Sequence, residues 1–127
     1  MNEQIKSYTE LEVWRRTKDL VKEIYLSTNH FPKEEMFGLV NQMRRCAVSI
    51  PSNIAEGCGR NYTKDSIQFF FIARGSLYEL ETQIHLSFDL NFINQQKLEM
   101  LLDQLLHARK LLNGFIRYYQ QLNNKKQ

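Results

Sequence analysis

Residues 44–60 read RRCAVSIPSNIAEGCGR, and this segment decides how the chain folds. It contains both cysteines, one of the two prolines and two of the five glycines. Such a composition fits either a catalytic loop or a helix interrupted by proline. Apolar residues keep helical spacing across Pro51, at Leu39, Met43, Ala47, Ile50 and Ile54. The segment is therefore predicted to be helical. Proline inside a helix removes one hydrogen bond and crowds the preceding turn, which predicts a kink at Pro51.

The same three-four rhythm of apolar residues extends in both directions from this segment. It predicts four helices, over about residues 10–29, 32–57, 64–90 and 95–122. No stretch alternates like a strand, and the connections are short, so sequential helices are expected to be antiparallel. The predicted fold is all-α: one domain, residues 1–127, forming an up-down-up-down four-helix bundle.

Local sequence signals predict where the helices begin and end. Thr9 followed by Glu12 has the spacing of a capping box for the first helix. Gly57 and Gly59 can supply a left-handed C-cap for the second helix. Asn94 is placed to cap the fourth helix.

Composition indicates a globular protein of the cytoplasm. The chain is 43% hydrophobic and 24% charged. Its N-terminus lacks the apolar core of a signal peptide, and no apolar run reaches the ~18 residues of a membrane span. Two cysteines without an export signal are expected to stay reduced.

The residues that could support catalysis or bind metal are few. Cys46 and Cys58 are twelve positions apart, which on one helix is ~18 Å, too far for a disulfide. Ser49, Ser52 and Cys58 have no histidine nearby in the sequence to act as a base. Glu81, His85 and Asp89 form a helical stripe, but no second Glu-x-x-His sequence provides ligands from a facing helix. We therefore expect no enzymatic activity, cofactor, metal or small-molecule substrate.

Three segments, in this order, resemble a known family: LEVWRRTKDLVKEIY, FPKEEMFGLVNQMRRCAVSIPSNIAEGCGR and ARGSLYELETQ. They resemble the small bacterial four-helix-bundle proteins encoded in intervening sequences of 23S rRNA genes, often labelled ribosomal proteins. The resemblance covers roughly residues 9 to 120. It implies a homopentameric ring without enzymatic activity. A more distant similarity links this fold to the accessory proteins of diversity-generating retroelements, which are pentameric and basic and work with nucleic acid. Cys46 and Cys58 depart from the family pattern.

Two kinds of interaction surface are predicted. The third helix is apolar on more than one face, which is typical of burial against a second subunit as well as its own bundle. The residues predicted at that interface are Phe69, Phe71, Ala73, Gly75 and Ser76. The net charge is +3, and residues 95–127 carry six basic and two acidic side chains. A basic surface for RNA or DNA is the alternative function, with contacts predicted at Arg44, Arg45, Arg60, Arg109, Lys110 and Arg117.

Overall fold

The computed structural model describes residues 7–126, and this part of the chain forms four long α-helices without any strand. They are α1 (Glu12–Thr28), α2 (Asn41–Cys58), α3 (Thr63–Asp89) and α4 (Gln95–Lys126). The predicted all-α class with four helices is confirmed for these residues. Residues 1–6 and 127 of the predicted domain lie outside them. None of the described helices has the length and hydrophobicity that crossing a membrane requires.

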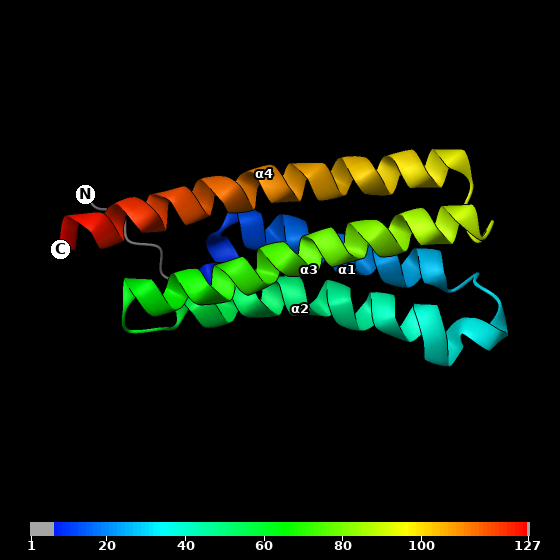
Figure 1. The fold of residues 1–127 in the computed structure, drawn as a ribbon, viewed down its shortest axis with the longest axis horizontal. Helices are drawn as coiled ribbons and strands as arrows, with labels where there is room; N and C mark the ends of the chain where they lie inside the picture. Colours follow the sequence, from blue (N-terminus) through cyan, green and yellow to red (C-terminus); the bar gives the residue numbers. More distant parts are fainter. Residues whose placement is uncertain (1–6, 127) are drawn as a thin grey trace.

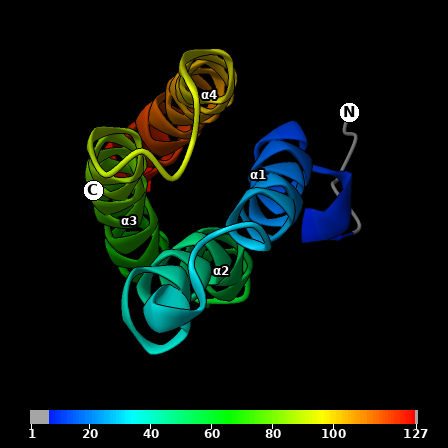
Figure 2. The same cartoon turned by 90° about the vertical axis from the view of Figure 1, so that its right-hand side faces the viewer.

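The helices lie side by side along the long axis, and in Figure 1 each runs opposite to the one before it. Viewed from the end, they occupy four corners (Figure 2). α1 packs against α2 and α4, and α3 also packs against α2 and α4. Consequently α2 and α4 lie at opposite corners.

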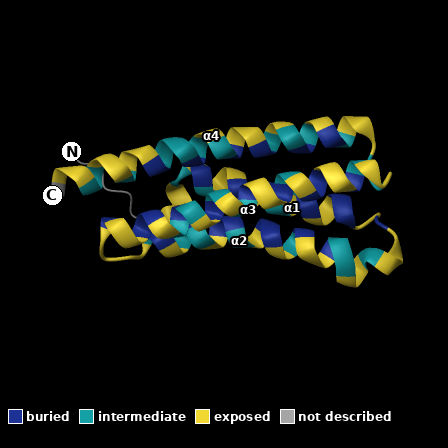
Figure 3. Cartoon of the chain, viewed as in Figure 1, coloured by how far each residue is buried: buried dark blue, intermediate teal, exposed yellow. Residues whose placement is uncertain are grey.

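The core runs along the centre of the bundle, where buried residues line the inner face of every helix (Figure 3). In α3 the buried positions advance by alternate steps of three and four, which keeps them on one face of the helix. The α3 positions are Phe70, Ala73, Leu77, Leu80 and Ile84, and the α4 positions that follow the same rhythm are Leu98, Leu101, Leu105, Ala108 and Leu112.

The second helix starts later than its sequence predicts. Instead of a helix from residue 32, the chain forms a 3₁₀ turn (Lys33–Glu35) and one π-helical turn (Met36–Val40) before α2 begins. Gly38 departs from helical dihedral angles, with φ −112° and ψ −111°. The Glu35 carboxylate accepts a hydrogen bond from the Leu39 amide at 3.2 Å and so supports the irregular turn. The predicted stripe of apolar residues begins only at Leu39, so its spacing gave no information about residues 32–38.

α2 continues as an α-helix through Pro51, whose side chain is buried. Two polar side chains near the proline bond to the backbone of their own helix. Ser49 Oγ donates to the Cys46 carbonyl at 2.6 Å, and Asn53 Nδ2 donates to the Ser49 carbonyl at 2.8 Å. These contacts add bonds to carbonyls in the part of the helix that the proline disturbs. The bend at Pro51 stays a prediction.

The predicted cap of the first helix is wrong. Ser7, not Thr9, provides the side-chain cap: its Oγ accepts from the Thr9 amide at 3.1 Å and starts a 3₁₀ turn (Tyr8–Glu10). α1 then begins after Leu11 without a side-chain cap. The fourth helix is capped as predicted, because Asn94 Oδ1 accepts from the Lys97 amide at 2.8 Å.

The left-handed glycine cap of α2 is also wrong. Gly59 ends the helix with φ −89°, and no glycine within residues 7–126 has positive φ. Gly57 lies inside the helix and has a packing role instead. A Cβ atom there would lie 2.4 Å from Cε1 of Phe70, so only glycine lets α3 approach this closely.

Candidate interaction surfaces

The two thiols and the nearby serine are engaged in structural contacts. Both cysteines are free, as expected from their spacing on one helix. Burial, with the nearby Glu79 carboxylate, raises the pKa of Cys46 to about 12, and burial raises the pKa of Cys58 to about 11. Cys46 Sγ donates to the Ser76 carbonyl at 3.1 Å, and the hydroxyl groups of Ser49 and Ser76 share a hydrogen bond of 2.8 Å. Thiols with such high pKa values are poor nucleophiles at neutral pH.

The basic side chains predicted on α2 differ in how far they are engaged within the chain. Arg44 spans the α1–α2 contact: its Nε donates to Thr28 Oγ1 at 3.0 Å and its Nη2 to Asn29 Oδ1 at 3.0 Å. Its guanidinium also lies 4.6 Å from the ring centroid of Tyr25. Arg45 is exposed and makes no hydrogen bond or ion pair with the described residues.

Arg60, just beyond the C-terminus of α2, is also paired. Its Nη2 lies 2.8 Å from the Glu56 carboxylate, and its guanidinium is 4.5 Å from the ring centroid of Phe69. Both contacts tie this basic side chain to its own bundle, although it remains exposed.

The basic side chains predicted on α4 show the same contrast. Arg109 Nη1 pairs with the Glu81 carboxylate at 3.0 Å, and its guanidinium lies 4.8 Å from the Tyr78 ring centroid. Both partners belong to α3, so Arg109 joins the two helices. Lys110 and Arg117 are exposed and form no ion pair or hydrogen bond with the described residues.

The structure does not gather the six predicted nucleic-acid contacts into one surface. Arg44 and Arg45 lie on α2, whereas Arg109, Lys110 and Arg117 lie on α4 at the opposite corner of the bundle (Figure 2). Arg44, Arg60 and Arg109 already pair within the chain. Of the six predicted contacts, the three that stay unpaired in the described part of the chain, Arg45, Lys110 and Arg117, are therefore separated between α2 and α4.

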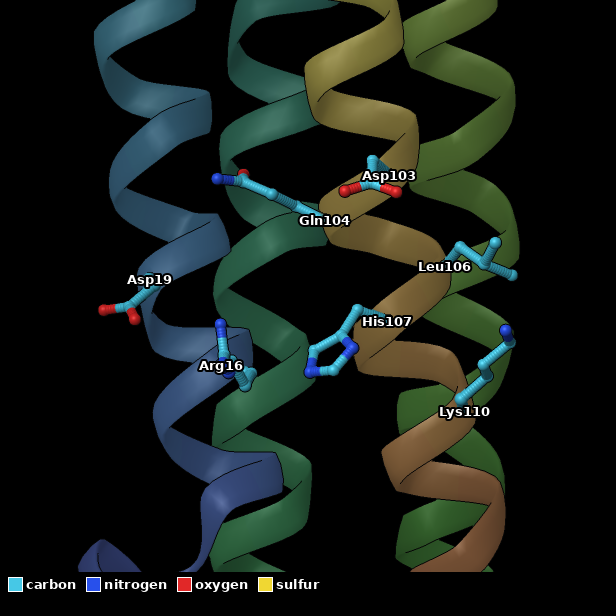
Figure 4. A pocket seen from close by; sticks show the side chains of 7 residues that line it. All are labelled: Arg16, Asp19, Asp103, Gln104, Leu106, His107 and Lys110. Atoms are coloured by element: carbon cyan, nitrogen blue, oxygen red, sulfur yellow. The ribbon is translucent and has the colours of Figure 1, made fainter.

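A polar pocket of about 320 Å³ lies between α1 and α4 (Figure 4). Its lining combines basic and acidic side chains with His107: Arg16, Lys110, Asp19 and Asp103. Gln104 also lines it, with a buried Oε1 that has no hydrogen-bond partner among the described residues. The pocket contains neither a serine nor a cysteine, and its two carboxylates would oppose a phosphate group. No group of three or more potential metal ligands occurs within residues 7–126.

The five residues predicted at a subunit interface lie in different environments. Ala73 is wrong as an interface residue, because it is fully buried in the core of its own bundle. Ser76 lies in the α2–α3 contact and bonds to Ser49. Phe69 and Phe71 are partly buried beneath arginine side chains. Gly75 alone lies open, with no atom within 4 Å of the position of an added Cβ.

The sequence did not single out the exposed face of α3 on which Gly75 lies. This α3 outer face comprises residues that are all exposed and recur at steps of three and four: Gln68, Ile72, Gly75, Glu79, Thr82 and Leu86. Ile72 is 52% exposed and Leu86 is 46% exposed. The face could have been found by assigning the core positions first and then reading the opposite side of the helix.

A groove between α1 and α2 was also missed. We define the α1–α2 groove by Trp14, Lys18, Tyr25, Arg44, Arg45 and Val48. Val48, which is 40% exposed, lies at the junction between the apolar part and the basic part of the groove. None of the residues that line the groove is acidic. These side chains come from two separate helices, so spacing along one helix could not reveal them.

Comparison with known proteins adds the following findings. The family described as 23S rRNA-intervening sequence protein matches residues 9–114. A crystal structure of a protein of unknown function from the S23 ribosomal protein family of Bacteroides thetaiotaomicron is similar in fold, with a TM-score of 0.74. It is 23% identical and the alignment covers 82% of this chain and 97% of the other. No curated protein matches the chain.

Proposed function

Because the chain belongs to the 23S rRNA-intervening sequence protein family, we propose that it is a non-enzymatic, homo-oligomeric helical scaffold. Its shape in this proposal is an antiparallel up-down-up-down bundle with a bend at Pro51. The subunits form a homopentamer and act through protein–protein contacts and RNA contacts in the bacterial cytoplasm. The two unpaired cysteines are consistent with a reducing compartment.

The observation that carries this proposal is the apolar surface of α3. Ile72 and Leu86 are about half exposed, although they belong to a helix that also supplies the core. Exposed apolar side chains that share a helix face are typical of protein contact sites. Gly75 leaves room on the same face for another backbone to approach. Burial of this surface against a second subunit would remove it from water.

The absence of enzymatic activity in the proposal is supported by the raised pKa values of Cys46 and Cys58. Ser49 donates its hydroxyl hydrogen within its own helix instead of to a catalytic base. Neither the matched family nor the similar crystal structure is described by an enzymatic activity.

The experiment that tests the scaffold is a native mass measurement of the purified full chain, before and after nuclease treatment. We expect a mass several times 15.2 kDa that nuclease does not change. A monomer at micromolar concentration would refute the scaffold.

A second candidate function, the binding of RNA or DNA, is favoured by the free cations. Arg45, Lys110 and Arg117 are exposed and unpaired within the described residues. Five copies in one assembly would repeat these charges, and phosphate binding by them would weaken steeply with salt. The test is a binding titration with labelled RNA at two salt concentrations. Reversal of Lys110 and Arg117 to Glu should weaken binding, and an unchanged affinity would exclude this surface.

A further inference from the structure

Two exposed surfaces of this chain have complementary shapes and charges. The α3 outer face is a ridge with exposed apolar residues at Ile72 and Leu86 and with Glu79 between them. The α1–α2 groove is hollow, has an apolar part around Val48, and carries cations but no carboxylate. The chain thus presents both an apolar-acidic ridge and an apolar-basic groove.

We propose that the α3 outer face of one copy packs into the α1–α2 groove of a second copy of this chain. The inference rests on the proposed function, and it specifies which surfaces form the subunit contact. Ile72 and Leu86 are then buried against Val48 and the aromatic side chains of the groove. Glu79 lies on the side where the cations of the groove can pair with it.

The cations of the groove favour this occupant. Arg45 has no ion pair within the described residues of its own chain, and Lys18 lies 5.3 Å from the ring centroid of Trp14 without a carboxylate partner. An acidic helix with exposed apolar residues would satisfy these charges and cover the apolar part together. Nucleic acid would pair with the cations and could stack on Trp14, but it would leave the aliphatic side chains around Val48, Pro51 and Ala55 without an apolar partner.

Gly75 is consistent with a ridge that approaches its partner closely. A glycine inside a helix is less favourable than alanine, and no neighbouring group within the chain requires it at this position. In the proposed contact, the missing side chain lets the α3 backbone approach the floor of the groove between Ile72 and Glu79.

The contact uses two different surfaces of each chain. α1 and α3 lie at opposite corners of the bundle (Figure 2), so one copy can use its α3 outer face and its α1–α2 groove at the same time. Such a head-to-tail contact generates a ring when the rotation closes, and a filament otherwise. An isologous dimer would instead pair identical surfaces.

The test blocks each surface separately with a positive charge. Val48→Arg blocks the groove, and Ile72→Arg blocks the ridge; both positions are exposed, so the fold should remain intact. Leu106→Arg is the matched control, because Leu106 is also 40% exposed but lies on α4, outside both surfaces. Each blocked variant should self-associate at least about tenfold more weakly than the wild type, and the control should not.

Mixing the two blocked variants gives the decisive measurement. The ridge of Val48→Arg is intact, and so is the groove of Ile72→Arg, so an equimolar mixture should form heterodimers with twice the 15.2 kDa chain mass. Two arginines would repel each other in the remaining contact, so growth should stop at the dimer. Recovery of a dimer would also show that both variants are folded.

The outcomes separate this inference from the proposed function. A monomeric wild type refutes the scaffold itself. A wild-type oligomer whose mass is unchanged in both blocked variants refutes only the ridge-and-groove contact, and so does a mixture that remains monomeric. An oligomer that nuclease dissolves would be held together by nucleic acid and would overturn the proposed contact.

Discussion

Substitution of Gly57 by alanine tests the closest helix contact in the bundle. An alanine Cβ would lie 2.4 Å from Cε1 and 2.9 Å from Cδ1 of Phe70, and 3.0 Å from the Ser66 carbonyl oxygen. Carbon atoms in favourable contact are about 3.5 Å apart or more, so the ring would have to retreat by about 1 Å. Phe70 is fully buried, with the rings of Phe115 and Tyr119 centred 5.0 Å and 4.8 Å away. There is little room for it to move.

Two effects of opposite sign determine the stability of this variant. Overpacking a tight core typically costs about 1–3 kcal/mol, and the rigid surroundings of Phe70 favour the upper end. Alanine is better than glycine inside a helix by about 1 kcal/mol. The free energy of unfolding should therefore fall by about 2 kcal/mol. For a chain of this size, this corresponds to a decrease in Tm of about 8 °C.

Gly114→Ala is the matched control, because it makes the same substitution inside α4. The nearest group to its added Cβ is Arg117 Nη2 at 3.7 Å, an ordinary contact, so this variant should gain up to about 1 kcal/mol. Urea unfolding followed by circular dichroism, at equal subunit concentrations, measures both changes. A Gly57→Ala variant as stable as the wild type, or an equal loss of stability in Gly114→Ala, would contradict this prediction. Phe70→Leu should relieve part of the Gly57→Ala penalty, and the double-mutant cycle measures that coupling.

Three further perturbations have defined outcomes. Burial raises the pKa of Cys58 to about 11 and of Cys46 to about 12, so iodoacetamide at pH 8 should modify the native thiols at least about 100-fold more slowly than in urea. The folded state binds the protons of these two thiols more tightly than the unfolded state, and this difference stabilises the fold. The stabilisation should be complete below pH 9 and lost as the pH rises through 11 and 12. A pH series of urea unfolding measures this loss. Pro51→Ala should straighten α2 and alter the native mass; a crystal structure of the variant with unchanged helix geometry, together with an unchanged mass, would contradict the predicted bend.

The helices were predictable because their buried residues keep a strict rhythm. In α3, the steps from Phe70 through Leu77 to Ile84 place every core residue on one face, and this pattern depends only on the local sequence. The cap at Asn94 was equally local, since the donor lies three residues away. Features that depend on a few neighbouring residues of one helix could therefore be predicted from the sequence.

Features that depend on two helices could not be predicted. Gly57 was interpreted as a helix terminator, but its role is set by Phe70, which reaches it from the next helix. Ala73 was assigned to a subunit interface because it is small, whereas its position on the inner face of α3 places it in the core. The irregular turn at Gly38 escaped prediction because the stripe of apolar residues begins only at Leu39, so its spacing says nothing of the preceding turn.

The number of basic residues in the sequence is a poor guide to the basic surface that the fold offers. Arg44, Arg60 and Arg109 each carry a full charge, yet each is held by partners within the bundle. A ligand that takes any of them must first break those contacts, so their contribution to binding is smaller than that of an unpaired cation. Of the predicted contacts, only Arg45, Lys110 and Arg117 remain unpaired within residues 7–126, and they lie on two opposite corners. A single chain cannot present all three to one short stretch of nucleic acid. A partner that contacts both corners must be extended or must meet several copies, which links any nucleic-acid binding to the subunit contact through α3.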